Sequence, residues 1–358
     1  MMWVKGELLT DIDAPGVDPT GQLERAAQPV PFDRRAWFRR VRRHDGSVPL
    51  ACRAASEGAL CWLFLKRDGA GAVSSLSNAF SHAFRPVFSG NPDPERQRAM
   101  LVAIARRLRM ARPRIASLTL WPVPETGGSA DLLQGSLAAA GWKGFAWERS
   151  VIWTANVAGH SFEAYWAARP AHVRAAFANE VAGANFETQV FSRIGTEAWE
   201  AFEGVARTGT SYPGGESEFL RETAAAESES GFARLGLCRV DGAVVAAQFW
   251  TVENGVARLL ASARSDGVAG PSPRTILTAA MLSHFIDEDK VRTIEFKMEQ
   301  EEGPADWADD RARLFCLEAY NPATLAGLWG AARAKIAELV RRRIGRKARL
   351  RFIHSSRE

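Results

Sequence analysis

Carboxylates around one apolar segment are the side chains of this sequence best suited to acid–base chemistry. Glu295 stands in the apolar segment 292–298, where burial would raise its pKa toward that of a general base. The same group could instead be a structural partner of an arginine, and both interpretations stay open. The acidic run that follows includes Glu299 and Glu301, which could gather a cationic amine or form a solvated loop.

A helix start near residue 273 could hold an anion. Ser272 is a suitable N-cap and Pro273 suits the first helical position, so a helix is expected over residues 275–287. The unpaired N–H groups and the positive dipole end of such a start favour negative charge.

Other chemical motifs are missing from the sequence. Its six histidines show no metal-binding spacing, and neither a G-x-S-x-G elbow nor a P-loop occurs. Cys238 and Cys316 lie in expected strands and are interpreted as buried apolar groups. Trp250 and Trp307 are interpreted as core or as pocket wall.

The elements that must position these residues follow an α/β pattern. Asp93-Pro94 predicts a helix start, and Asp241-Gly242 predicts a hairpin turn. Each half of the chain has a meander of strands, a helix, a strand, a shorter helix and a closing strand. The expected strands include 50–54, 60–66, 73–78, 83–88, 115–121, 145–155, 234–240, 244–252, 256–263, 292–298 and 314–320.

The N-terminal residues show no clear periodicity. Residues 1–30 are rich in Pro, Gly and Asp, and we expect residues 1–44 to form a separate arm. A basic stretch at 34–43 contains Trp37 and Phe38. It could grip a nucleic acid, but an amphipathic helix with its aromatic side chains turned inward is favoured.

Length and composition are those of a globular protein. The 358 residues suggest two or three domains. Hydrophobic residues make up 46% and charged residues 24%, which excludes a disordered, collagen-like or coiled-coil chain. The apolar runs are shorter than the ~20 residues that cross a bilayer, and no secretory signal is expected. Four scattered cysteines fit reduced thiols and a cytoplasmic location.

Positive charge is concentrated near the C-terminus. The net charge is +5, yet nine cations and one anion lie between Arg333 and Arg351, so this segment carries 9 − 1 = +8 and the rest 5 − 8 = −3. Apolar residues at helical spacing predict a basic amphipathic helix. It could dock on an anionic membrane surface, bind an acidic partner or RNA, or pack on its own domain with its charges in water.

Two stretches resemble the GNAT acyltransferases. The first runs from residue 234 to residue 284 and includes Ser272-Pro273-Arg274-Thr275. The second contains Ile294-Glu295-Phe296, Asp306-Trp307 and Ala319-Tyr320-Asn321-Pro322. Together they look like the CelD/BcsL group, named for cellulose biosynthesis and related to the tandem-GNAT Fem peptidyltransferases. The segment 162–174 with its Tyr-x-x-x-Arg-Pro also resembles that group.

The resemblance implies two GNAT-like α/β domains in tandem, with mixed, largely antiparallel sheets flanked by helices. A degenerate domain would cover residues 45–159, an acyltransferase-like domain 160–330 and a basic tail 331–358. In such enzymes the loop and helix after the third strand bind the pyrophosphate of coenzyme A. The matching residues here are Arg264, Pro271, Ser272, Arg274 and Thr275.

This chain departs from the family pattern at two places. Arg274 replaces the usual glycine, and it could either block a phosphate or bind it. The usual Tyr-Lys pair is missing, so Tyr320 is the candidate acid for the leaving thiolate, and only through a rearranged geometry.

The expected function is transfer of an acyl group from acetyl-CoA or a longer acyl-CoA to an amine of a small molecule, sugar or envelope precursor. The candidate catalytic residues are Glu295, Glu299 and Tyr320, and the candidate pocket residues are Trp250, Glu301 and Trp307. The alternatives are a catalytically degenerate scaffold in polysaccharide export and a Fem-like aminoacyl-tRNA-dependent transferase. No metal and no specific nucleic acid are expected.

Overall fold

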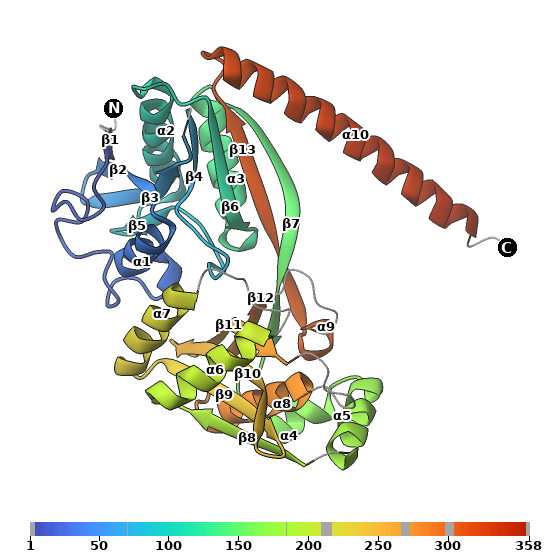
Figure 1. The fold of residues 1–358 in the computed structure, drawn as a ribbon. Coiled ribbons are helices and arrows are strands. Elements are labelled where there is room, and N and C mark those ends of the chain that lie inside the picture. The colour runs from blue at the N-terminus through green and yellow to red at the C-terminus, as the bar shows by residue number, and fades with distance from the viewer. Residues whose placement is uncertain are drawn as a thin grey trace. The chain divides into compact units, whose positions relative to one another are not determined.

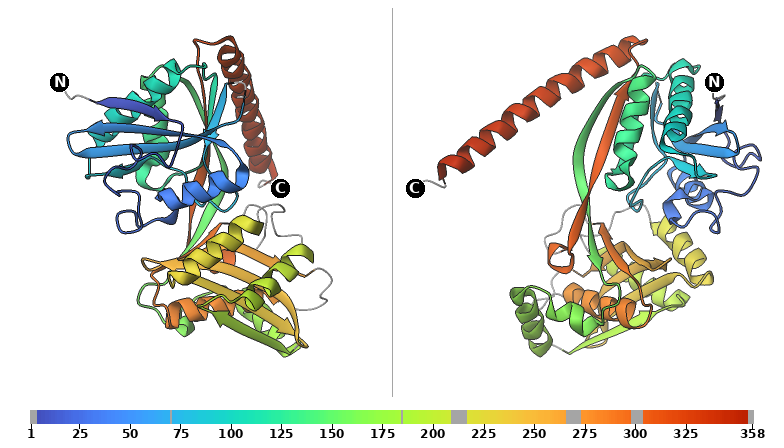
Figure 2. Two further views of the ribbon diagram at one scale, coloured as in Figure 1. Left: turned by 60° about the vertical axis from the view of Figure 1, so that its left-hand side comes forward. Right: turned by 180° about the vertical axis from the view of Figure 1, so that it is seen from behind.

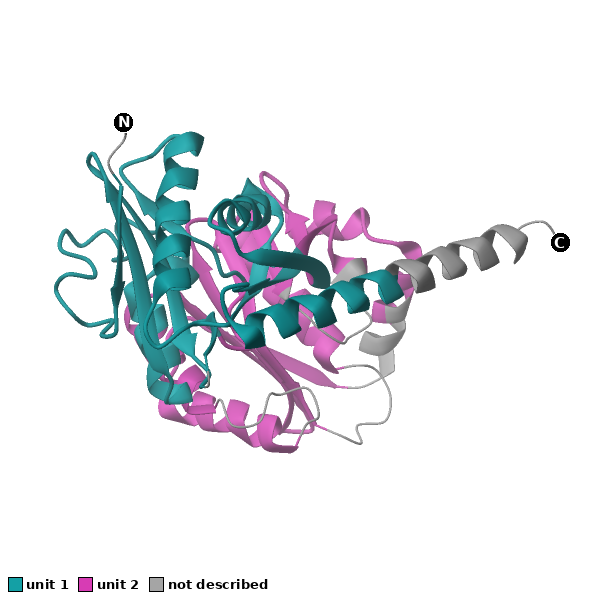
Figure 3. Cartoon of the chain, turned by 90° about the horizontal axis from the view of Figure 1, so that it is seen from above, with its two compact units in different colours: residues 1–77, 83–149, 314–358 teal, residues 78–82, 150–313 magenta. Residues whose placement is uncertain are grey.

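The chain forms two compact units, each assembled from separate stretches of sequence (Figure 3). The fold was obtained as a computed structural model, which describes residues 4–69, 71–183, 185–208, 217–265, 273–297 and 304–355. Unit 1 comprises residues 1–77, 83–149 and 314–358, and unit 2 comprises residues 78–82 and 150–313.

Unit 1 contains a capped helix that a local sequence signal predicts. The Asp93 side chain accepts a hydrogen bond from the N–H of Arg96, and Pro94 is the first residue of helix α2, as expected. The unit contains β1 (Lys5–Leu9), α1 (Arg35–Asp45), β2 (Val48–Ser56), β3 (Ala59–Arg67), β4 (Ala72–Ser75), β5 (Val87–Ser89), α2 (Pro94–Met110), β6 (Ser117–Pro124), α3 (Ser129–Ala139) and α10 (Leu325–Ser355).

The sheet of unit 1 has the strand order β1-β2-β3-β4-β6-β13-β7, and β5 pairs with β3. Strands β4 and β6 run parallel, joined through the crossover helix α2. Helix α2 packs on α3 and on β1, β2 and β3 (Figure 1).

The N-terminal residues belong to the body of unit 1, which corrects the expectation of a separate arm over residues 1–44. Strand β1 pairs antiparallel with β2, and Ile12 and Val17 have no solvent exposure. Helix α1 buries both Trp37 and Phe38, so its aromatic side chains face inward as the favoured interpretation predicted. The apolar side chains spaced along an otherwise polar segment supply this anchoring.

Unit 2 contains the predicted hairpin turn at Asp241-Gly242 and a second turn of the same kind. Asp241 and Gly242 both have positive φ and join β9 to β10, and Asn254-Gly255 joins β10 to β11 in the same way. The unit contains α4 (Phe162–Ala167), α5 (Ala171–Gly183), β8 (Phe186–Phe191), α6 (Thr196–Thr208), α7 (Ser217–Glu229), β9 (Ala233–Val240), β10 (Ala243–Glu253), β11 (Val256–Arg264), α8 (Pro273–Asp287), β12 (Thr293–Lys297) and α9 (Pro304–Trp307).

The sheet of unit 2 lies between two layers of helices (Figure 2). Its strand order is β7-β12-β11-β10-β9-β8, with β11 and β12 parallel. Neighbouring residues of β10 point to opposite faces: Phe249 contacts Trp199 of α6, and Trp250 contacts Phe285 of α8. Gly236 of β9 lets α8 approach closely, because a Cβ there would lie 2.4 Å from Met281 Sδ.

Two long strands contribute to both units. Of β7 (Lys143–Asn156), residues 143–149 belong to unit 1 and 150–156 to unit 2. Of β13 (Asp310–Tyr320), residues 310–313 belong to unit 2 and 314–320 to unit 1. The units are therefore not the contiguous segments 45–159 and 160–330 that the sequence suggested.

Several local expectations were wrong. Strand β8 was not expected, because its sequence is partly polar and contains no apolar run. Such a sequence suits the edge of the sheet, where β8 lies. Residues 83–88 were expected to be a strand, but only Val87–Ser89 pair with β3. Among the described residues, none of the helices is long and apolar enough to span a bilayer.

Candidate functional site

A parallel strand pair that separates partway along its length forms the framework of the candidate site in unit 2. Strands β11 and β12 pair from Val256–Thr293 to Leu259–Phe296. Strand β11 then continues to Arg264, still paired with β10. The β12-facing edge of residues 260–264 is thus left without a paired strand among the described residues.

Two arginines lie near the head of α8, one on the helix and one at the end of β11. Arg274 lies in the first turn, and Arg264 is the last residue of β11. Burial lowers the pKa of the Arg274 guanidinium, and the positive charge of the neighbouring Arg264 lowers it further. In the described first turn of α8, from Pro273, no residue is acidic. Two cations and a helix N-terminus therefore share one region, which suits a multiply charged anion.

A chain of buried hydrogen bonds fixes the start of α8 to the sheet. The Thr278 hydroxyl donates to the carbonyl of Arg274 at 2.8 Å. Gln248 Nε2 donates to Thr278 Oγ1 at 2.8 Å, and Trp250 Nε1 donates to Gln248 Oε1 at 3.0 Å. Trp250 has no solvent exposure, so of its two sequence interpretations the structure places it in the core.

Glu295 sits in a partly buried ion-pair cluster beside the end of the β11–β12 pairing, with 22% of its side chain exposed. Arg258 Nε donates to Glu295 Oε2 at 3.0 Å, and His82 Nδ1 lies 3.6 Å from the same oxygen. Burial alone would raise the pKa of the Glu295 carboxyl, but His82 and Arg258 outweigh burial and hold it below its ordinary value. We expected Glu295 to be a general base because burial would raise its pKa, but in the structure its pKa is lowered.

His82 is the residue of this cluster that sequence reasoning missed. It belongs to unit 2 although it stands in the middle of unit 1's sequence, and only 2% of its surface is exposed. Its Nε2 lies 2.8 Å from the carbonyl oxygen of Leu259, the last β11 residue paired with β12. Because a carbonyl oxygen only accepts hydrogen bonds, Nε2 carries the proton. No local motif around His82 marks this long-range contact.

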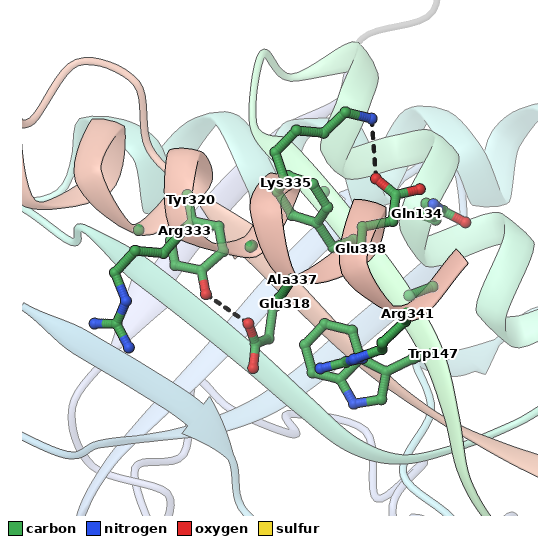
Figure 4. A pocket seen from close by; sticks show the side chains of 14 residues that line it. Gln134, Trp147, Glu318, Tyr320, Arg333, Lys335, Ala337, Glu338 and Arg341 are labelled. Carbon is green, nitrogen blue, oxygen red and sulfur yellow. Dashed lines mark hydrogen bonds and ion pairs between the residues drawn. The ribbon is translucent and has the colours of Figure 1, made fainter. Parts of the chain in front are cut away.

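Tyr320 lies in unit 1, whereas Glu295 lies in unit 2. The Tyr320 hydroxyl donates to Glu318, and burial together with that carboxylate raises its pKa well above the ordinary phenol range. It lines a pocket of about 920 Å³ formed by β7, β13 and α10, where Arg341 stacks over the ring of Trp147 (Figure 4). The pocket residues that Figure 4 labels are Gln134, Trp147, Glu318, Tyr320, Arg333, Lys335, Ala337, Glu338 and Arg341.

The Tyr-x-x-x-Arg-Pro segment is a structural clamp within unit 2. The Tyr165 hydroxyl donates to the carbonyl of Trp307, and burial raises the pKa of Tyr165. The Arg169 guanidinium lies 4.4 Å from the centroid of the Tyr165 ring and pairs with Asp309. Trp307 is buried against Trp166, so this segment ties α4 to α9.

Four of the expected site residues fall outside the described residues. Pro271 and Ser272 precede α8, and Glu299 and Glu301 follow β12. Thr275 is described and lies half-buried in the first turn of α8. Within the described residues, no group of His, Cys, Asp and Glu is arranged to hold a metal ion.

Part of unit 2 matches a known protein family. Residues 172–307, all within unit 2, match the family model of the Acetyltransferase (GNAT) domain. No curated protein sequence gives a significant match.

Solved structures share the fold at low sequence identity. A tandem GNAT protein from the clavulanic acid biosynthesis pathway has a TM-score of 0.50 at 16% identity, covering 88% of this chain and 98% of that one. FemX has a TM-score of 0.52 at 9% identity, covering 78% and 90%. The C-terminal domain of a putative lysylphosphatidylglycerol synthetase from Agrobacterium fabrum has a TM-score of 0.50 at 12% identity, covering 76% and 84%. The fold of this chain is that of the GNAT superfamily.

Proposed function

We propose that the protein is an acyl-CoA-dependent N-acyltransferase whose site lies in unit 2. The observation that carries this proposal is that β11 loses its β12 partner after Leu259–Phe296 and ends at Arg264, which is close enough to Arg274 in the first turn of α8 to act on its charge. Arg264, Arg274 and the first N–H groups of α8 would bind the diphosphate of coenzyme A. The acyl thioester would lie along the unpaired edge of β11.

The reaction needs no covalent enzyme intermediate. The nitrogen of the acceptor amine attacks the thioester carbonyl carbon and forms the new C–N bond. The C–S bond then breaks, the thiolate of coenzyme A leaves, and the proton lost by the amine balances the one that the thiolate takes up. The protein contributes orientation and main-chain donors at the β11 edge.

In this proposal, Glu295 is a positioning residue and not the general base. Its lowered pKa weakens it as a proton acceptor, and its carboxylate already binds Arg258 and faces His82. Its contribution is to hold β12 against β11 at the point where the two strands separate. The acceptor amine would therefore lose its proton to water or to a group outside the described residues.

A catalytically degenerate scaffold is the second candidate. The hydroxyls of Tyr165 and Tyr320 both donate to protein oxygens, and both have raised pKa values. Neither is thus prepared to protonate a leaving thiolate, which favours a protein that binds an acyl-CoA without transferring its acyl group.

The acceptor is proposed on the resemblance alone. The CelD/BcsL-like stretches suggest an amine of a sugar or an envelope precursor. Shared fold with FemX keeps a Fem-like aminoacyl-tRNA-dependent transferase as a third candidate.

Thermal unfolding with acyl-CoAs and a thiol-release assay test these candidates together. A ligand at 100 times its Kd should stabilise the protein by about 2.7 kcal/mol. We expect acetyl-CoA or a longer acyl-CoA to raise the melting temperature, and an amine panel to release free thiol. Arg264→Ala should remove most of the shift, whereas Arg106→Ala, an exposed arginine on α2 of unit 1, should leave it intact.

The outcomes separate the three proposals. A melting shift without thiol release from any amine supports the scaffold. No shift with any acyl-CoA, together with acyl transfer from a charged tRNA, supports the Fem-like reaction and overturns acyl-CoA dependence.

A further inference from the structure

Helix α10 presents large apolar side chains to solvent. Eight large hydrophobic residues of the described chain are roughly half exposed or more, and six of them lie on this helix. Leu325 is 83% exposed, Trp329 73% and Ile336 63%. Isolated exposed apolar residues are ordinary, but a group on one helix marks an interaction surface. We call this group the α10 stripe; its members are Leu325, Leu328, Trp329, Ile336, Leu339 and Val340.

The α10 stripe is continuous along one side of the helix. At about 100° per residue, its six members fall within an arc of about 120°. From Leu325 to Val340 the stripe runs for about 22 Å. Arg333 and Lys335 fall on its two edges by the same periodicity, so cations flank the apolar surface on both sides.

The opposite side of α10 packs on the rest of unit 1. Gly330, Ala334, Ala337 and Arg341 line the pocket described above (Figure 4). A Cβ on Gly330 would lie 2.4 Å from the Tyr320 ring, so the helix sits close against β13 there. The helix thus turns its small residues inward and its large apolar residues outward, which reverses the usual arrangement of a helix on a domain.

Charge decides which partner fits this surface. Between Arg333 and Arg351 the sequence has nine cations and one anion, and Glu338 is already paired with Lys335 at 2.9 Å. A second copy of the helix would bring a surface of the same sign, whereas anionic lipid headgroups supply the opposite one. An apolar stripe with cationic edges and an exposed tryptophan matches the boundary between headgroups and acyl chains.

We infer that α10 docks the protein on an anionic membrane surface, with its stripe lying in the plane of the interface. The stripe would enter the acyl boundary, and the cations would contact lipid phosphates. This inference is independent of the proposed acyltransfer.

Flotation with lipid vesicles tests the inference on the full chain. Vesicles of phosphatidylcholine alone are compared with vesicles that contain about one third phosphatidylglycerol. We expect flotation with the anionic vesicles, weakening as salt is raised. Ile336→Glu and Trp329→Glu should each weaken binding about tenfold or more. Met110→Glu is the matched control, because Met110 is 58% exposed at the end of α2, and it should float like the parent protein.

Tryptophan fluorescence gives a second measurement, because it reports whether Trp329 enters an apolar environment when the vesicles are bound. Emission should shift to shorter wavelength when anionic vesicles are added, and Trp329→Leu should lose that shift. All variants change exposed side chains, so their thermal unfolding should match that of the parent protein.

Three results would overturn the inference. One is no flotation with either vesicle. Another is flotation that salt abolishes but the stripe variants do not change, which means charge attraction without insertion. The third is a dimer that Ile336→Glu dissociates, with no flotation, because the stripe would then bind a second copy of the chain.

Discussion

The two units share one topology and differ at the position where an anion would bind. In each unit, a helix lies in the connection between two parallel strands. Helix α2 lies between β4 and β6, and helix α8 lies between β11 and β12. In unit 1 the helix head is capped by its own carboxylate, Asp93. In unit 2 the helix head lies near Arg264 and Arg274.

The strand pairs end differently as well. In unit 1 the pairing stops at Ser74–Thr119, but the Ser75 hydroxyl bonds both the N–H and the carbonyl of Trp121, so the strands stay joined. In unit 2, β11 continues past the last pair without such a bridge among the described residues. In unit 1 a carboxylate stands at the helix head and the strand pair is bridged, and neither feature favours an anionic ligand. We therefore propose that the ligand binds in unit 2.

The largest effect is expected from Glu295→Gln. The next-to-last strand pair is Arg258–Glu295 in unit 2 and the apolar Val73–Leu118 in unit 1. Losing the carboxylate leaves the guanidinium of Arg258 without its charged partner, and the Arg258 residue is only 5% exposed. We expect a loss of about 3 kcal/mol in the free energy of unfolding, measured with urea.

At acidic pH, the parent protein and the Glu295→Gln variant should no longer differ in their free energy of unfolding. The Glu295 pKa is lowered in the folded state, so its stabilisation is present above the unfolded value of about 4.3 and is lost as pH falls through the folded value. The urea midpoints of parent and variant should converge on acidification. The control Glu57→Gln removes an exposed carboxylate 3.5 Å from Arg96 and should change little at any pH. A stable Glu295→Gln variant would show that the cluster does not hold the strands.

A smaller effect is expected from Arg274→Ala. A hydrogen bond to a charged group contributes about 2 kcal/mol, so affinity for coenzyme A should fall about thirtyfold. The helix start itself should persist, since Thr278 bonds the main-chain carbonyl of Arg274. Equilibrium dialysis with labelled coenzyme A measures the change. Unchanged or tighter binding would mean that Arg274 blocks the phosphates.

The smallest effect is expected from Asp93→Ala in unit 1. Loss of the N-cap should destabilise the protein by about 1 kcal/mol in thermal unfolding. Affinity for acyl-CoA should stay the same, because we propose the ligand site at the head of α8 and not at this helix. A gain of a second binding site in this variant would show that the cap alone had kept unit 1 closed.

Structural features that depend on a few neighbouring residues could be predicted from the sequence. The Asp93-Pro94 helix start and the turn at Asp241-Gly242 depend on local backbone preferences, and the structure has them where expected. The order of elements in the two halves was also predicted. The GNAT fold of the chain was predicted from residues such as Ile294-Glu295-Phe296 and Asp306-Trp307.

Long-range placement could not be predicted. His82 meets Leu259 across 177 residues of sequence, and nothing near it in the chain encodes that contact. Strands β7 and β13 each run through both units. In the sequence, each looks like an ordinary closing strand, so this division could not be predicted. The low pKa of Glu295 depends on His82 and Arg258 together, so reasoning from an apolar strand alone gave the opposite direction.

Calorimetric titration of the protein with coenzyme A tests the central claim most directly. The account predicts one binding site per chain, lost when Arg264→Glu and Arg274→Glu are combined and retained in Asp93→Ala. Two sites per chain, or a site that survives both charge reversals, would contradict the assignment of ligand binding to the head of α8.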